Sequence, residues 1–185
     1  MFRQTLLIAL LVSLLATATY AGFTCAKPCY GNMCCSIPSN NEYYLTDFCG
    51  TTSACGPTPY CSGTHYFTAD SQRFGCGKYL NLCTASKKCI KAQIVDAGPA
   101  IWVEQDAGRA IIDASPSICK LLFNANSCGW SDHFSITAVL TSATDTRPLG
   151  PFNVTDTEYD IMIKEGIEAM DSCIAAEECG PVVNV

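Results

Sequence analysis

The chain has 185 residues, a formal net charge of −6 and 14 cysteines. A cysteine content this high indicates an oxidising compartment, in which disulfides persist. No stripe of lysine and arginine marks a surface that would neutralise phosphates, so we expect no nucleic-acid partner.

Residues 1–21 are predicted to be a secretory signal peptide. Arg3 supplies a positive charge, Leu6–Ala16 is apolar apart from one serine, and small residues up to Ala21 suit signal peptidase. A membrane anchor is the alternative, but a bilayer-spanning helix needs about 20 apolar residues, and this run is shorter. We therefore expect no membrane anchor and a mature chain from about Gly22 that enters the secretory pathway.

All the cysteines lie in the mature part, and their even number favours complete pairing, with the connectivity left open. A metal site is the alternative, because Cys25–Cys35 is dense enough in thiols to coordinate an ion. Finger-like CxxC spacing does not recur, however, and His65 and His133 are the only histidines. We therefore expect no metal and no cofactor.

Residues 22–144 are interpreted as one β-rich domain, because turns rich in Gly, Pro, Ser and Asn separate short apolar stretches. The stretch Ile136–Leu140 is the clearest strand, since it is rich in β-branched residues. The expected strands are Tyr66–Ala69, Lys78–Leu82, Ile90–Val95, Ile101–Glu104, Ala110–Ile112 and Phe134–Leu140.

Two helices are expected. Ser115 can cap a helix whose first position is Pro116. Further along, Thr155–Glu158 has the sequence of a capping box, and apolar residues then recur every three or four positions. This second helix is expected to end at Gly180 and Pro181.

Residues 145–185 are predicted to be an acidic helical tail, joined to the domain through a linker with prolines and a glycine at 145–152. The negative balance of the mature chain lies there, where nine acids oppose Arg147 and Lys164. We hypothesise that the tail is a propeptide or regulatory segment, with a helix packed on the domain as the alternative. Asn153 begins the one N-glycosylation sequon, which predicts a surface position.

Four short motifs follow one another between Thr68 and the helix at Ser115. They are Thr68–Ser71, Phe74–Leu80, Ile94–Pro99 and Arg109–Ser115. Their order resembles the double-psi β-barrel of barwin, the expansins and the rare-lipoprotein-A-like lytic transglycosylases. The resemblance implies a mainly β, disulfide-stapled barrel-like domain with a short helix. It also implies a polysaccharide-binding groove lined by Asp113.

Asp113 is the first candidate for a catalytic acid. Glycan cleavage needs a proton for the leaving oxygen, and a carboxylic acid with a raised pKa supplies it. Asp113 follows two isoleucines, so we expect burial to raise its pKa; its alternative is a helix-entry residue. Asp96, in an Asp-Ala-Gly-Pro turn, is the second candidate. Asp70 is the third candidate. The transglycosylase-like pattern has a histidine near the position of Ser71, this chain has none there, and the adjacent Asp70 could take its place.

Other side chains have competing interpretations. Glu104 and Asp106 lie between the Gly-Pro turn and Asp113, and we expect both to be solvated. His133 does not indicate a serine-hydrolase triad, because the chain has no Gly-x-Ser-x-Gly elbow. Four aromatic residues could stack on sugar rings or belong to the core: Trp102, Trp130, Tyr66 and Tyr79.

Seven segments, which together run nearly from one end of the chain to the other, carry a second resemblance. They are Phe23–Cys35, Tyr43–Gly50, Thr68–Cys83, Asp96–Pro99, Ile111–Pro116, Cys128–Asp132 and Arg147–Val154. With their cysteine spacing they are similar to the amoeba-type lysozymes, the Aly family. The resemblance implies a bacteriolytic β-1,4-N-acetylmuramidase that acts on peptidoglycan and is either delivered to the lumen of phagosomal or lysosomal vesicles or secreted. We expect a monomer. A lytic transglycosylase and a non-catalytic, barwin- or expansin-like module that binds cell-wall glycan are the alternatives.

Overall fold

The computed structural model describes residues 22–50, 52–56 and 65–180, so the predicted signal peptide lies outside the described residues. The strands are β1 (Pro28–Cys29), β2 (Met33–Cys34), β3 (Glu42–Asp47), β4 (Phe67–Ala69), β5 (Tyr79–Cys83), β6 (Lys88–Asp96), β7 (Ile111–Ala114), β8 (Ser135–Leu140) and β9 (Gly150–Asn153). The α-helices are α1 (Ser71–Phe74), α2 (Ile101–Ala107), α3 (Pro116–Phe123) and α4 (Asp156–Ala175). Short 3-10 turns lie at Tyr30–Asn32 and Trp130–Asp132.

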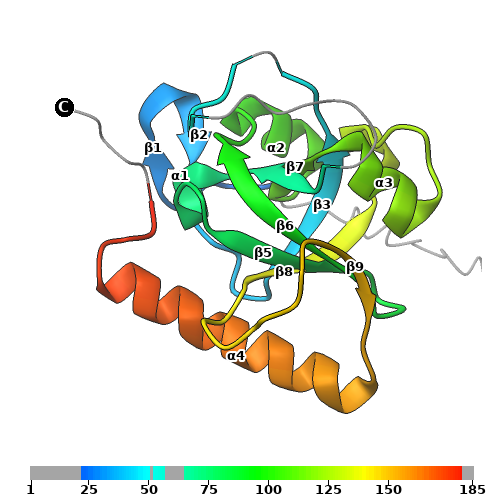
Figure 1. The fold of residues 1–185 in the computed structure, drawn as a ribbon. Coiled ribbons are helices and arrows are strands. Elements are labelled where there is room, and N and C mark those ends of the chain that lie inside the picture. The colour runs from blue at the N-terminus through cyan, green and yellow to red at the C-terminus, as the bar shows by residue number, and fades with distance from the viewer. Residues whose placement is uncertain (1–21, 51, 57–64, 181–185) are drawn as a thin grey trace, which may run out of the picture.

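Six of the described strands close into a barrel (Figure 1). They pair in the order β4, β7, β3, β8, β5 and β6, and β6 returns to β4. The β3–β7 and β4–β6 pairs are parallel, and the other pairs in the barrel are antiparallel. The predicted mainly β, disulfide-stapled barrel with a short helix and a helical tail is therefore confirmed.

Apolar side chains from β3, β5, β6, β7 and β8, together with side chains from the helices, form the main buried core. Fully buried members include Tyr43, Leu45, Leu80, Leu82, Ile90, Ile94, Ile112 and Ile118. Five of the six predicted strands are confirmed, with ends that differ by one or two residues. The strand β3 was missing from the prediction, although Tyr43 and Leu45 alternate with less buried neighbours as a strand in a barrel wall requires.

The strand predicted at Ile101–Glu104 is wrong, because this stretch begins helix α2. Its β-branched and aromatic residues have the composition of a strand. Gly108, at φ 77°, closes the last turn of α2 by donating its N–H to the carbonyls of Glu104 and Gln105. The helical turn also directs the Glu104 carboxylate inward, where it lies 2.6 Å from Arg73.

Helix α3 begins as predicted, with Pro116 in its first turn. Ser115 caps it through its backbone carbonyl, which accepts hydrogen bonds from the N–H groups of Ile118 and Cys119. The predicted cap by the Ser115 side chain is wrong, because its buried hydroxyl makes no bond within the described residues. The preceding strand β7 pairs with both β3 and β4, so this helix entry follows directly from the barrel wall.

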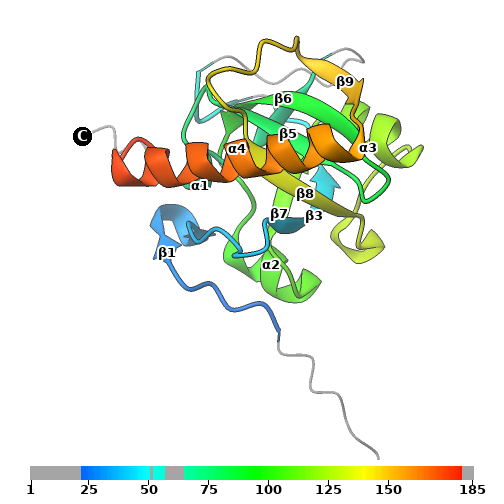
Figure 2. The ribbon, with the colours of Figure 1, turned by 90° about the horizontal axis from the view of Figure 1, so that it is seen from below.

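The tail helix α4 lies along the outside of the barrel, across β8 (Figures 1 and 2). It begins with the predicted capping box: Glu158 donates its N–H to the Thr155 hydroxyl at 3.3 Å, and the Glu158 carboxylate accepts from the Thr155 N–H at 2.7 Å. It ends at Ala175, before the predicted stop at Gly180. The Cys173–Cys179 disulfide turns the chain back there.

The segment 145–185 also contributes a strand to the sheet. Strand β9 pairs antiparallel with the first half of β6, where Phe152 lies opposite Cys89. Asn153, at the end of β9, is exposed as the sequon predicts. Removal of the tail stays a prediction. It would remove β9 from the sheet and α4 from the outside of the barrel.

Disulfides join segments close in sequence. The described pairs are Cys25–Cys34, Cys29–Cys35, Cys55–Cys76, Cys83–Cys89, Cys119–Cys128 and Cys173–Cys179. No cysteine in the described part of the chain is free. None of the described helices is long and apolar enough to cross a membrane.

Substitution of Gly166 tests the packing of α4 on β8. A Cβ at this position would lie 2.5 Å from the Val139 Cγ2 atom and 2.7 Å from the Leu140 carbonyl oxygen. We therefore expect Gly166→Ala to lower the free energy of unfolding by about 1–3 kcal/mol through overpacking. Urea titration measures this change, with Asp171→Ala on the exposed side of the helix as the control, expected to stay within about 0.5 kcal/mol. Stabilisation of about 1 kcal/mol, as helix propensity alone predicts, would contradict the close packing.

Candidate active site

The strand register places a row of four side chains on one face of the barrel wall. Thr46 on β3 lies opposite Asp113 on β7, Asp113 lies opposite Ala69 on β4, and Ala69 lies opposite Asp96 at the end of β6. Directly paired residues of neighbouring strands point to the same face. The register shifts by one residue before the Ala69–Asp96 pair, and the charge of Asp96 still acts on Asp113. One strand separates the two aspartates, so their Cα atoms lie roughly 10 Å apart, with the small Ala69 between them.

Asp113 is the central carboxyl of this row. Its side chain is half-buried, and its Oδ1 atom accepts a hydrogen bond from the Thr46 hydroxyl. Burial raises the pKa of Asp113, the Thr46 bond lowers it, and the nearby Asp47 and Asp96 raise it again. Because the net shift of the pKa is upward, Asp113 keeps its proton to a higher pH than an aspartic acid in water.

Asp96 and Asp47 hold loops on either side of Asp113. The Oδ1 atom of Asp96 accepts hydrogen bonds from the N–H groups of Ala54 and Ala97, both at 2.8 Å. The Oδ1 atom of Asp47 accepts from the Cys128 N–H at 2.6 Å. The structure thus brings together Asp113 and Asp96, both of which the sequence singled out. Asp47 was missed, because its place at the end of β3 became apparent only with the strand pairing.

Asp70, the third candidate, lies inside the protein with no exposed surface. Its Oδ1 atom accepts hydrogen bonds from the Arg73 guanidinium at 2.7 Å and from the Gln72 amide at 2.6 Å. Burial raises the pKa of Asp70 to about 8, against the opposing charge of Arg73. Since a buried carboxyl does not reach a glycan at the surface, we assign Asp70 to an internal network and not to the outward row.

The expectation that Glu104 is solvated is wrong. Its side chain has no exposed surface, and its Oε1 atom accepts from Arg73 at 2.6 Å and from the Ile111 N–H at 2.8 Å. A buried carboxylate requires such partners, because isolated charges are costly away from water. Asp106, two residues later on α2, is exposed as expected.

The turn after Asp96 packs directly on this network. Gly98 donates its N–H to the Gln72 side-chain oxygen at 2.8 Å. A Cβ at Gly98 would lie 2.5 Å from the Gln72 amide nitrogen and 2.7 Å from the Asp70 Oδ1 atom, so a larger residue cannot fit without displacement. The network therefore sets where the Asp96 turn lies. The Asp70-x-x-Arg73 spacing was the one sequence signal for it.

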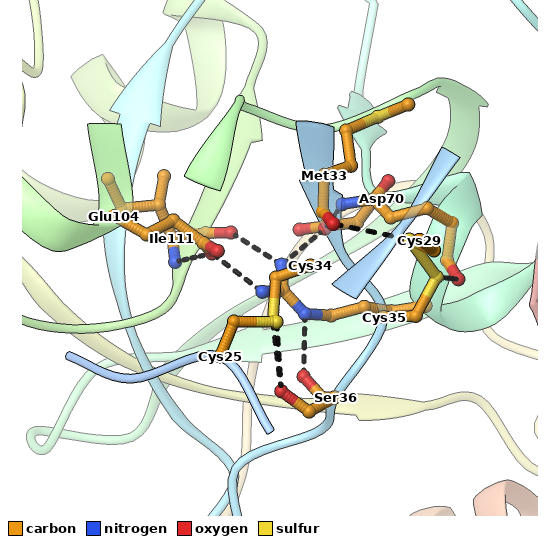
Figure 3. Close-up of a disulfide and its surroundings, with 11 residues drawn as sticks. Cys25, Cys29, Met33, Cys34, Cys35, Ser36, Asp70, Glu104 and Ile111 are labelled. Carbon is orange, nitrogen blue, oxygen red and sulfur yellow. Dashed lines mark hydrogen bonds and ion pairs between the residues drawn. A yellow bond between two sulfur atoms is a disulfide. The ribbon is translucent and has the colours of Figure 1, made fainter. Parts of the chain in front are cut away.

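Two disulfides of the N-terminal segment cover the same network. Figure 3 shows Asp70, Glu104 and Ile111 beside the Cys25–Cys34 and Cys29–Cys35 disulfides. Arg73 donates its Nε–H to the Ser36 carbonyl oxygen at 2.9 Å, directly after Cys35. These disulfides thus hold the segment that closes the buried side of the site.

The four candidate aromatic residues have different positions. Trp102 and Trp130 are 56% and 46% exposed and contact each other, with ring centroids 6.4 Å apart. Tyr66 is partly buried against Gly150, and Tyr79 lies over Lys91 on the β5–β6 wall. His133 stacks on the ring of Tyr44 at 4.9 Å.

The row presents two carboxyl side chains on the outer face of the barrel. The pKa of Asp113 is raised by burial, and strand β4 separates Asp113 on β7 from Asp96 on β6. Among the described residues, no group of three His, Cys, Asp or Glu side chains is placed to hold a metal ion. The chemistry available to these two side chains is acid–base chemistry.

Several known proteins are similar to this chain over most of its length. Lysozyme A of Dictyostelium discoideum is 65% identical over 158 residues, which cover 85% of this chain and 87% of the relative. Lysozyme C of the same organism is 62% identical over 170 residues, which cover 92% of this chain and 93% of the relative. Lysozyme D, also from that organism, is 37% identical, and the match covers 94% of this chain and 96% of the relative. Residues 33–177 match the family described as Lysozyme A, AlyA. This chain therefore belongs to the Lysozyme A family.

Proposed function

We propose that this lysozyme hydrolyses the β-1,4 bond between N-acetylmuramic acid and N-acetylglucosamine in bacterial peptidoglycan, with Asp113 as its general acid. The observation that carries the proposal is the half-buried Asp113 carboxyl in an outward-facing row with Asp96. The names of its relatives support a lysozyme activity. The disulfides and the predicted signal peptide support a place in the secretory pathway, in vesicles or outside the cell.

The proposed reaction divides the work between two carboxyls. Asp113 donates its proton to the glycosidic oxygen as the bond from that oxygen to C1 of the muramic acid breaks. Asp96 accepts a proton from a water molecule, whose oxygen forms the new bond to C1 on the opposite face of the ring. Proton exchange with solvent then returns both carboxyls to their starting states.

The separation of the two residues suits this division. Inverting glycosidases keep their carboxyl groups about 6.5–9.5 Å apart to leave room for a water molecule. Cα atoms roughly 10 Å apart, with side chains on the same face, are compatible with that range. The two bonds to Asp96 engage its Oδ1 atom, so Oδ2 is the atom that we assign to the water.

Product analysis on purified peptidoglycan tests the activity. We expect new reducing ends that carry N-acetylmuramic acid, because water is the nucleophile, and mass spectrometry of the released fragments identifies them. Products ending in 1,6-anhydro sugars would indicate a lytic transglycosylase and contradict the role of Asp96. Binding to the walls without any released sugar would indicate a glycan-binding module instead.

Replacing Asp113 tests the general acid. Asp113→Asn keeps the shape of the side chain and removes its proton, so we expect lysis to fall on the order of a hundredfold or more. Turbidity loss of a cell-wall suspension measures the rate, and circular dichroism checks the fold. Asp160→Asn, on the exposed side of α4, is the matched control and should retain full activity. Full lysis by Asp113→Asn would exclude Asp113 as the acid.

The pH profile tests the environment of Asp113. A general acid acts in its protonated form, so kcat/KM declines as the pH rises through its pKa. The Thr46 bond lowers the pKa of Asp113, so Thr46→Val should raise that pKa and move the alkaline limb of the profile to higher pH. Thr137→Val on β8 is the control and should leave this limb in place. An alkaline limb that stays fixed or moves to lower pH in Thr46→Val would contradict the assignment.

A further inference from the structure

We infer that Trp102 and Trp130 form a glycan-binding subsite beside the carboxyl row, where the sugar chain of peptidoglycan stacks on the two indole rings. The inference rests on the proposed function for its substrate and adds the surface that positions the chain. We call the two residues together the tryptophan pair.

The tryptophan pair is an exposed apolar feature with a defined geometry. The rings are 56% and 46% exposed, and they meet edge to face, with centroids 6.4 Å apart and planes inclined by 78°. In an edge-to-face arrangement each ring keeps at least one face for another partner. Among the other large apolar side chains that the described structure exposes, only Tyr79 is aromatic.

The elements that carry the pair are attached to β3 and β7, the strands on which Thr46 and Asp113 lie. Trp130 begins a 3-10 turn two residues after Cys128. Cys128 donates its N–H to the Asp47 side chain at the end of β3, and its carbonyl accepts from the Asp47 N–H. Trp102 is in the first turn of α2, which follows the Asp96 turn and is held to β7 through Glu104 and Ile111. The pair is therefore tied to the two neighbouring strands that carry the Thr46–Asp113 end of the carboxyl row.

The chemistry of the pair matches a sugar chain. The axial C–H groups of pyranose rings form apolar faces that cover an indole ring, while the sugar hydroxyls stay at the rim, where polar groups bind them. Exposed polar side chains lie beside the pair, including Gln105, Ser131 and Asp132. Attachment of these two elements to β3 and β7, the strands of Thr46 and Asp113, favours a glycan over a second copy of the chain or a lipid surface.

The tryptophan content makes the subsite directly observable, because the chain has only two tryptophans and both are in the pair. The probe is peptide-free glycan strands of peptidoglycan, added to the Asp113→Asn variant to prevent cleavage. We expect the intrinsic fluorescence to change and to saturate with glycan concentration. Unchanged fluorescence at glycan concentrations that saturate binding in a sedimentation assay would overturn the subsite.

Single substitutions measure its contribution. Trp102→Ala and Trp130→Ala should each weaken glycan binding about tenfold and raise KM with little change in kcat, because stacking acts equally on substrate and transition state. Trp130→Phe should retain part of the affinity. Leu149→Ala, an exposed apolar residue of the tail, is the matched control and should bind as the wild type.

The outcomes separate this inference from the proposed function. If the alanine variants bind and lyse like the wild type, the subsite is wrong and the muramidase assignment stands. If they lose binding while the wild type never releases sugar, the subsite stands and the hydrolase assignment fails. If the wild type dimerises or binds phospholipid vesicles, and the alanine variants do not, the pair serves that partner and the glycan subsite is overturned.

Discussion

The guanidinium of Arg73 joins four separate parts of the chain inside the protein. It bonds to Asp70 at 2.7 Å, to Glu104 on α2 at 2.6 Å, to the Ser36 carbonyl at 2.9 Å and to the Ile111 carbonyl on β7 at 3.4 Å. Ion pairs at this depth contribute little net stability, but removal of one partner costs about 3–5 kcal/mol, because a buried charge is then uncompensated. The network therefore specifies how these parts meet more than how strongly they are held.

The same network determines the geometry of the outward carboxyl row. Ile111 bonds to both Glu104 and Arg73, and Asp113 is two residues further along the same strand. Gln72 and Asp70 leave space only for a glycine at position 98, which places the turn that follows Asp96. Two partly exposed acids thus owe their positions to an ion network that solvent does not reach. This rigidity supports the proposed reaction, in which two carboxyls act at a fixed separation.

The disulfides and the tail close the structure around this centre. The Cys25–Cys34 and Cys29–Cys35 disulfides hold the segment that contacts Arg73. Helix α4 packs on the barrel through Gly166 against β8 and through Met162 against Cys83 and Cys89. Small secreted domains use such covalent links to supplement a limited core. The tail shares in that core, so its covering of the barrel is a structural role whether or not it also regulates activity.

The sequence by itself determined the features that depend on neighbours along the chain. The capping box at Thr155, Pro116 at the start of α3, the β-branched strand at Ile136–Leu140 and the even number of cysteines could all be interpreted from local pattern. Asp113 and Asp96 became candidates because each stands in a short motif whose order resembles the double-psi β-barrel, and their catalytic roles stay a proposal.

Only the tertiary structure decided which carboxyls face solvent and which are buried. Asp70, Asp96, Glu104 and Asp113 are the same kind of group in the sequence, and nothing near Glu104 along the chain shows that it meets Arg73. Strand pairing brought Asp113 and Asp96 onto one face, and the helical turn of α2 directed Glu104 inward. The physical reason is that the pKa and the role of a carboxyl depend on burial and nearby charges, and these come from residues distant in the chain.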